Sequence, residues 1–97
     1  MKAEDLIKFL LSWKYRFCGI DKDSVVFATE RSWTAFYLKS TEVIIRDKRT
    51  EERKTYGYGF LKIINDKLYT LDKIEGENFY STNEVNVAAK GETFGLD

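Results

Sequence analysis

The first thirteen residues carry apolar side chains at the spacing of an amphipathic helix. Glu4 and Asp5 fall in its first turn, where the positive end of a helix dipole favours carboxylates. The pattern predicts a helix at the start of the chain, and an alternative in which the helix continues to Gly19 as its C-terminal stop stays open. The apolar positions of the predicted helix are Leu6, Ile7, Leu10, Leu11 and Trp13.

Beyond residue 14 the apolar spacing changes from helical to alternating. In an extended segment Tyr15 and Phe17 share one face, whereas Cys18 and Ile20 share the other. The polar residues 21–23 supply a turn, and the β-branched run after them predicts a returning strand. We expect Cys18 to be buried, because an unpaired cysteine in an apolar stretch usually packs as a small hydrophobe.

Two more strand-like runs follow, at residues 33–40 and 42–47. The segment from Arg46 to Lys54 contains no apolar residue, which predicts a solvent-exposed hairpin tip. The next two runs, 55–64 and 67–74, are separated only by Asn and Asp, residue types that tolerate the left-handed conformation of a tight hairpin. This hairpin is the clearest local prediction in the chain.

The end of the chain carries two competing patterns. Val85 and Val87 alternate as in a strand, but Ser81 followed three residues later by Glu84 matches a helix capping box. We favour a short C-terminal helix, followed by a tail over residues 91–97.

These elements predict a single α+β domain spanning residues 1–97. An N-terminal amphipathic helix is expected to pack on a curved antiparallel sheet or small barrel of about five to six strands, with the short C-terminal helix as the last element. At this length the chain builds one modest core, with no room for a second domain.

Composition excludes several classes of function. The 97 residues include no histidine and one cysteine, so the imidazole base of nucleophilic hydrolases is missing and a structural zinc site cannot form. We therefore predict a protein that is not an enzyme and that holds no metal or cofactor.

The predicted location is cytoplasmic. The longest apolar stretch, residues 6–13, is far shorter than the ~20 residues needed to cross a bilayer, and it lacks the basic start of a signal peptide. A single unpaired cysteine also suits a reducing compartment.

The first candidate site lies on the run at residues 33–40. If Phe36 and Leu38 point into the core, Trp33 and Tyr37 lie on the other face, which ends at Lys39, and are partly exposed. Exposed Trp and Tyr are often the energetic centre of protein interfaces. We therefore predict a small adaptor or inhibitor that docks on a larger protein partner, of the type common among phage and mobile-element accessory proteins.

The alternative prediction is a single-stranded nucleic-acid-binding domain. Tyr56 and Tyr58 would stack on bases in this hypothesis, while nearby cations contact phosphates. Acidic residues interleave with these cations and the chain has no net charge, which counts against the hypothesis. The cations concerned are Arg46, Lys48, Arg49, Arg53 and Lys54.

The segment Gly57 to Ile63 resembles the octapeptide of RNA-recognition (RRM) domains, in which rings on a central strand stack on bases. Two positions depart from that motif: Tyr56 stands where the basic residue belongs, and Ile63 stands where the last aromatic belongs. The RRM fold also begins with a strand, whereas this chain begins with a predicted helix. We therefore do not assign the chain to that family.

Charge is unevenly distributed along the chain. Residues 1–65 hold 13 Lys and Arg against 9 Asp and Glu, whereas residues 66–97 hold 3 against 7. The zero total thus divides into segments of +4 and −4. A partner that recognises one sign of charge is expected to lose affinity as salt is added.

Overall fold

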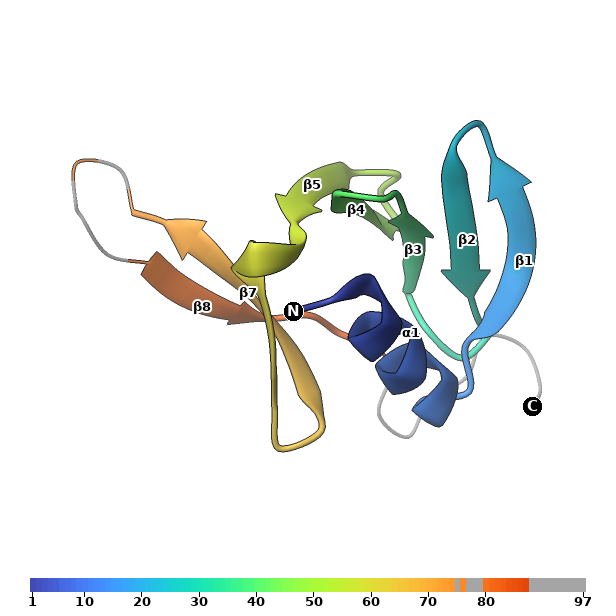
Figure 1. Cartoon of the computed structure of the whole chain (residues 1–97), viewed down its shortest axis with the longest axis horizontal. Coiled ribbons are helices and arrows are strands. Elements are labelled where there is room, and N and C mark those ends of the chain that lie inside the picture. The colour runs from blue at the N-terminus through green and yellow to red at the C-terminus, as the bar shows by residue number, and fades with distance from the viewer. Residues whose placement is uncertain (75, 77–79, 88–97) are drawn as a thin grey trace.

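The computed structural model describes residues 1–74, 76 and 80–87, and it places one α-helix and eight antiparallel strands in two sheets (Figure 1). The broad α+β class is confirmed, but the prediction of one sheet or barrel with about five to six strands is wrong. The first sheet is the meander β1 (Arg16–Asp21), β2 (Ser24–Ala28), β3 (Thr34–Leu38), β4 (Glu42–Asp47) and β5 (Arg53–Gly57). The second is the meander β6 (Leu61–Ile64), β7 (Lys67–Lys73) and β8 (Tyr80–Glu84).

The α1 helix (Ala3–Ser12) ends much earlier than Gly19. Lys14 adopts a left-handed conformation with φ of 65°, and its N–H donates to the Leu11 carbonyl at 3.0 Å. The next N–H, that of Tyr15, donates to the Leu10 carbonyl at 3.0 Å. This pair of bonds is the Schellman motif, which terminates a helix here with lysine in the position that glycine usually occupies. No helix in the described part of the chain is long and apolar enough to cross a membrane.

The β1 strand contains a bulge at Cys18. Phe17 pairs with Phe27 and Gly19 pairs with Val26, so Cys18 is an extra residue on the β1 side of the ladder. The bulge shifts the side-chain alternation and places Ile20 on the same face as Phe17. The prediction that Cys18 is buried is wrong, because β1 is an edge strand and its thiol is exposed.

The run 55–64 is not one strand. Residues Tyr58–Phe60 form the short 3-10 helix η1, which separates β5 from β6. The chain therefore leaves the first sheet at Gly57 and enters the second at Leu61. This break is the reason that two sheets form where one was predicted. The sequence did not indicate the break, because the aromatic run has no polar residue at that point.

The predicted hairpin after Ile64 is confirmed. Asn65 and Asp66 both have positive φ, of 50° and 62°, as a two-residue type I′ turn requires. The strands on either side pair from Leu61 opposite Thr70 to Ile64 opposite Lys67.

The predicted C-terminal helix is wrong over the residues of its capping box. Ser81 and Glu84 belong to β8, which pairs with β7, and residues 85–87 are not helical. The Ser81 hydroxyl donates to the Asp72 carbonyl on β7 at 3.2 Å instead of capping a helix. The rest of that prediction, and the predicted tail at 91–97, lie outside the described residues.

The core lies where α1 meets both sheets (Figure 1). Leu6 and Leu10 of α1 are completely buried, as is Phe36 at the centre of the first sheet. The second sheet adds Leu61 and Leu68 to the same cluster. One helix face thus joins the two sheets, and each sheet keeps one further face that α1 does not cover.

A buried polar contact ties three distant segments together. The Tyr15 hydroxyl, just before β1, bonds to the Ser32 hydroxyl and to the carbonyl of Val87. Burial raises the pKa of Tyr15, so the phenol stays protonated and can donate. This contact holds the segment after β8 against the loop that leads into β3.

Candidate functional site

The aromatic residues predicted on β3 lie beneath arginine side chains. Tyr37 is only 7% exposed, so the prediction that it is partly exposed is wrong. The Arg53 guanidinium lies 5.0 Å from the Tyr37 ring, and Arg46 Nη1 donates to the Tyr37 hydroxyl at 2.8 Å. Trp33 is half-buried, as predicted, and Arg49 lies 5.0 Å from its ring. We call these five residues the arginine-covered surface.

Acidic neighbours on the same hairpin hold two of these arginines. Arg46 binds both carboxylate oxygens of Glu51, at 3.0 and 3.1 Å, and Arg49 binds both oxygens of Asp47, at 3.0 and 3.2 Å. Glu51 makes its contact from a left-handed conformation with φ of 64°. Bidentate pairs of this kind are strong and directional. Arg46 and Arg49 therefore meet carboxylates of their own chain.

These contacts also shift acid–base equilibria. Hydrogen bonds from the Arg49 side chain and backbone lower the pKa of Asp47 from 3.8 to about 2. A carboxylate with so low a pKa is a weak general base at neutral pH. Burial lowers the pKa of Lys48, whose ammonium donates to the Thr29 carbonyl at 2.7 Å.

The remaining predicted site residues do not form one exposed surface. Tyr58 is buried, and its hydroxyl donates to the Lys39 carbonyl at 2.7 Å, so its ring is not available for stacking. Tyr56 packs against the core and lines the groove described next. Lys39 forms an ion pair with Asp23 at 3.7 Å. The helical turn at 58–60 is the reason that the rings of Tyr56, Tyr58 and Phe60 do not share one face.

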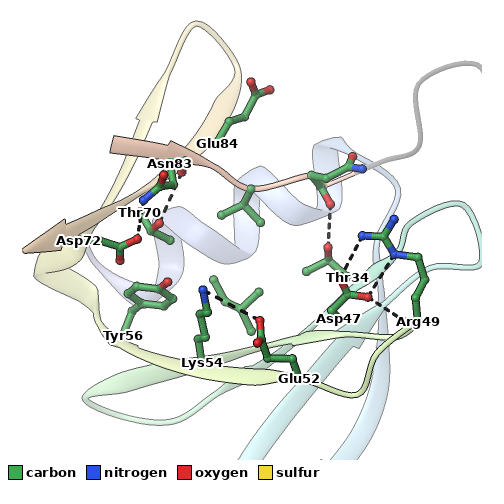
Figure 2. A pocket seen from close by; sticks show the side chains of 13 residues that line it. Thr34, Asp47, Arg49, Glu52, Lys54, Tyr56, Thr70, Asp72, Asn83 and Glu84 are labelled. Carbon is green, nitrogen blue, oxygen red and sulfur yellow. Dashed lines mark hydrogen bonds and ion pairs between the residues drawn. The ribbon is translucent and has the colours of Figure 1, made fainter. Parts of the chain in front are cut away.

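A polar groove of about 550 Å³ separates the strands β4 and β5 from β7 and β8 (Figure 2). Its charged side chains pair locally, with Lys54 4.0 Å from Glu52 and the Asp72 carboxylate bound to the Asn83 amide. Thr34 Oγ1 donates to the Asn86 carbonyl at 2.7 Å and joins the two walls.

The groove offers little chemistry. Within the described residues, no three His, Cys, Asp or Glu side chains gather closely enough to hold a metal ion. Asp47 lines the groove, and its lowered pKa weakens it as a base. The groove therefore carries neither a metal centre nor an evident acid–base pair among the residues described.

A different surface combines exposed rings with cations: the face of the three-stranded sheet that points away from α1. Strand register places Lys62, Tyr69 and Glu84 side by side, and Lys73 beside Tyr80. Since side chains alternate along a strand, the same face receives every second residue of β6 and β7. We call this set the aromatic-lysine face: Phe60, Lys62, Ile64, Lys67, Tyr69, Leu71, Lys73 and Tyr80.

The aromatic-lysine face carries exposed apolar side chains at both of its ends. Phe60 and Ile64 are each 42% exposed and Tyr80 is 49% exposed, while Leu71 is half-buried between the strands. The rings of Phe60 and Tyr80 meet edge to face, with centroids 5.6 Å apart. Ile64 lies at the other end of the sheet, where it pairs with Lys67, whereas Tyr80 pairs with Lys73. Exposed large apolar side chains that gather in one place, as Phe60 and Tyr80 do, mark interaction sites on proteins.

Sequence reasoning did not identify this face. In the run 67–73 both sets of alternate residues include apolar side chains. Leu68 lies on one face with Thr70, and Tyr69 and Leu71 lie on the other. Either face could have been the buried one. A signal was present nevertheless, since Lys67 and Lys73 accompany only the second face, and lysines rarely point into a core.

Comparison of the chain with protein-family models, with curated proteins and with solved structures finds no match.

Proposed function

We propose that this protein is a small non-catalytic module, an adaptor or inhibitor, that docks on a larger protein through its aromatic-lysine face. The observation that carries the proposal is the exposed ring pair of Phe60 and Tyr80 on one sheet face, with Ile64 exposed at the other end of the same face. An apolar and aromatic centre with a charged rim is the usual anatomy of a protein interface.

The rim indicates the charge of the partner. Lys62 and Lys73 are exposed at the border of the face, and Lys67 lies 3.7 Å from Glu84. The face therefore carries more positive than negative charge, although the chain as a whole is neutral. A partner with an apolar pocket bordered by carboxylates is complementary to this surface, and its binding should weaken as salt is added.

Two observations favour a protein over single-stranded nucleic acid. Two of the three arginines of the 46–54 hairpin, Arg46 and Arg49, are held by Glu51 and Asp47, which reduces their availability for phosphates. The aromatic-lysine face is partly aliphatic, at Ile64 and Leu71, and aliphatic side chains offer no surface on which bases stack.

The test compares matched surface variants in affinity capture from the native host. The double variant Ile64→Ser/Tyr80→Ser removes an exposed apolar side chain from each end of the face, and Leu11→Ser removes an apolar side chain of similar exposure from α1. We expect wild type and Leu11→Ser to retain the same partner, and the double variant to retain at most about a tenth as much, since interface anchors are worth ~2 kcal/mol or more. Thermal unfolding of all three chains establishes that each is folded.

Two results contradict the proposal. Recovery of the same partner by the double variant places the interface elsewhere. A labelled single-stranded oligonucleotide that binds wild type, and binds Ile64→Ser/Tyr80→Ser much more weakly, supports the nucleic-acid alternative instead.

A further inference from the structure

The β1 strand presents apolar side chains at the open edge of the five-stranded sheet. Phe17 is 59% exposed and Ile20 is 73% exposed, which is the highest exposure of any large apolar residue in the described part of the chain. The described residues supply β1 with one strand neighbour, β2. Its second row of backbone donors and acceptors is therefore available for pairing, as at any sheet edge.

The bulge at Cys18 gives this edge an unusual side-chain arrangement. Ile20 comes three positions after Phe17, so in a regular strand these two side chains would point to opposite faces. Because Cys18 is inserted, both lie on the face of their partners, Phe27 and Val25. Two apolar side chains thus stand near each other on one face of an edge strand.

The charges on β1 are arranged so that the strand complements itself. Arg16 is its first residue and Asp21 its last. Neither forms an ion pair with another described residue. If a second β1 runs antiparallel beside the first, Arg16 of each copy lies opposite Asp21 of the other. The same register sets Phe17 of each copy opposite Ile20 of the other. Because of the bulge, the two side chains of each such pair point to the same face of the joined sheet.

We propose that β1 pairs with β1 of a second copy of this chain, about a two-fold axis that passes between residues 18 and 19. The pairing joins the two five-stranded sheets edge to edge. It covers Phe17 and Ile20, and it forms two Arg16–Asp21 contacts, one on each side of the axis. A parallel arrangement in register would instead oppose like charges, which disfavours it.

The dimer uses a surface separate from the aromatic-lysine face. In Figure 1 β1 lies at one end of the molecule, and the three-stranded sheet lies toward the other end. Pairing through β1 therefore leaves the aromatic-lysine face of each copy uncovered. A dimer would therefore present two copies of the aromatic-lysine face, and a partner with repeated sites would gain avidity. Because the surfaces differ, either proposal can fail while the other holds.

The first test uses sedimentation equilibrium under reducing conditions over a wide range of chain concentration. We expect wild type to approach twice its monomer mass of 11.4 kDa as concentration rises. The variant Ile20→Lys should weaken association by about tenfold or more, since it places two lysines in the apolar contact. The Ile64→Ser/Tyr80→Ser variant is the matched control and should associate as wild type does.

A charge exchange tests the register itself. Arg16→Asp and Asp21→Arg should each weaken self-association by roughly tenfold, because each sets two pairs of like charges opposite one another. Mixing the two single variants restores both opposite-charge contacts, so the mixture should form a heterodimer about as tight as wild type. The double variant Arg16→Asp/Asp21→Arg should also recover.

Cys18 supplies a covalent readout, because it is the single cysteine of the chain and is exposed next to the proposed axis. In the dimer the two Cys18 residues are close enough for a disulfide, which needs Cα atoms within about 7 Å. Diamide, which takes up the two electrons and two protons, should link wild-type chains rapidly and Ile20→Lys chains slowly. A chain that stays monomeric at millimolar concentration, or a dimer that none of the β1 variants weakens, overturns the proposal.

Discussion

The arginine-covered surface and the aromatic-lysine face both combine aromatic rings with cations, yet the rings of the first are covered and those of Phe60 and Tyr80 on the second are exposed. On the first, the Tyr37 ring lies beneath Arg53 and binds Arg46, and it is 7% exposed. On the second, Tyr80 packs only edge to face against Phe60 and stays 49% exposed.

The difference comes from the cation and from its neighbours. Arginine has a planar head that stacks on a ring and donates in two directions, so Arg46 bridges Tyr37 and Glu51 at once. The lysines of the second sheet have compact, strongly hydrated heads that keep to water and leave the rings uncovered. Aromatic residues near cations can therefore be internal packing or an interface, and the identity of the cation decides between them.

The largest expected effect separates the core from the exposed face. Phe36→Ala removes a completely buried ring and should lower the free energy of unfolding by about 3–5 kcal/mol. Phe60→Ala truncates a ring that is 42% exposed and should cost less than about 1 kcal/mol. Urea denaturation of the two variants measures both. Equal losses would mean that Phe60 belongs to the core and that the aromatic-lysine face is not a free surface.

A smaller effect should separate the two tyrosine hydroxyls. Tyr37→Phe removes the acceptor of the Arg46 hydrogen bond and should destabilise the fold by about 1 kcal/mol. The loss is smaller to the extent that Arg46 is still held by Glu51. Tyr80→Phe changes an exposed hydroxyl and should stay within about 0.5 kcal/mol of wild type. Both values come from the same denaturation assay. A larger loss for Tyr80→Phe would reverse the assignment of the two surfaces.

The smallest expected effect is the pH dependence of the Asp47–Arg49 pair beside the arginine-covered surface. The folded-state pKa of Asp47 is about 2, below its unfolded value of 3.8. Its stabilising contribution is therefore complete above pH 3.8 and is lost as pH falls toward 2. The site is solvated, so the contribution is small and decreases further with salt.

The measurement for Asp47 compares wild type with Asp47→Asn by urea denaturation at about pH 5 and about pH 2.5. Wild type should lose more stability than Asp47→Asn between these two values, because only wild type loses a charge at this position. Parallel losses in the two chains would show that the ion pair adds nothing to folding.

Local features of the fold were predictable where one residue pattern allowed one structure. The helix follows from the spacing of Leu6 and Leu10, and the hairpin follows from Asn65-Asp66, whose left-handed conformations few other residue pairs accept. The predicted exposure of the 46–54 hairpin is confirmed for residues 49–54, whereas residues 46–48 are half-buried.

The errors fall where a local pattern allowed two structures and a distant segment chose between them. Ser81 and Glu84 suit a helix cap, but their backbone pairs with β7 instead. The prediction that Tyr37 is partly exposed was wrong for the same reason. Alternation of side chains alone could not predict that arginines from the next hairpin cover its ring.

By itself the sequence determined the α+β class, the start of the helix, the tightest turn and the absence of histidine chemistry. These depend on residue identity or on neighbours within a few positions. Only the tertiary structure decided that the strands divide into two sheets at Tyr58–Phe60 and that Tyr37 is covered while Tyr80 is open. The reason is physical, since α1 has one apolar stripe, which packs against one side of each sheet. The other side of the five-stranded sheet carries the arginines that cover Tyr37, and the other side of the three-stranded sheet is open to solvent.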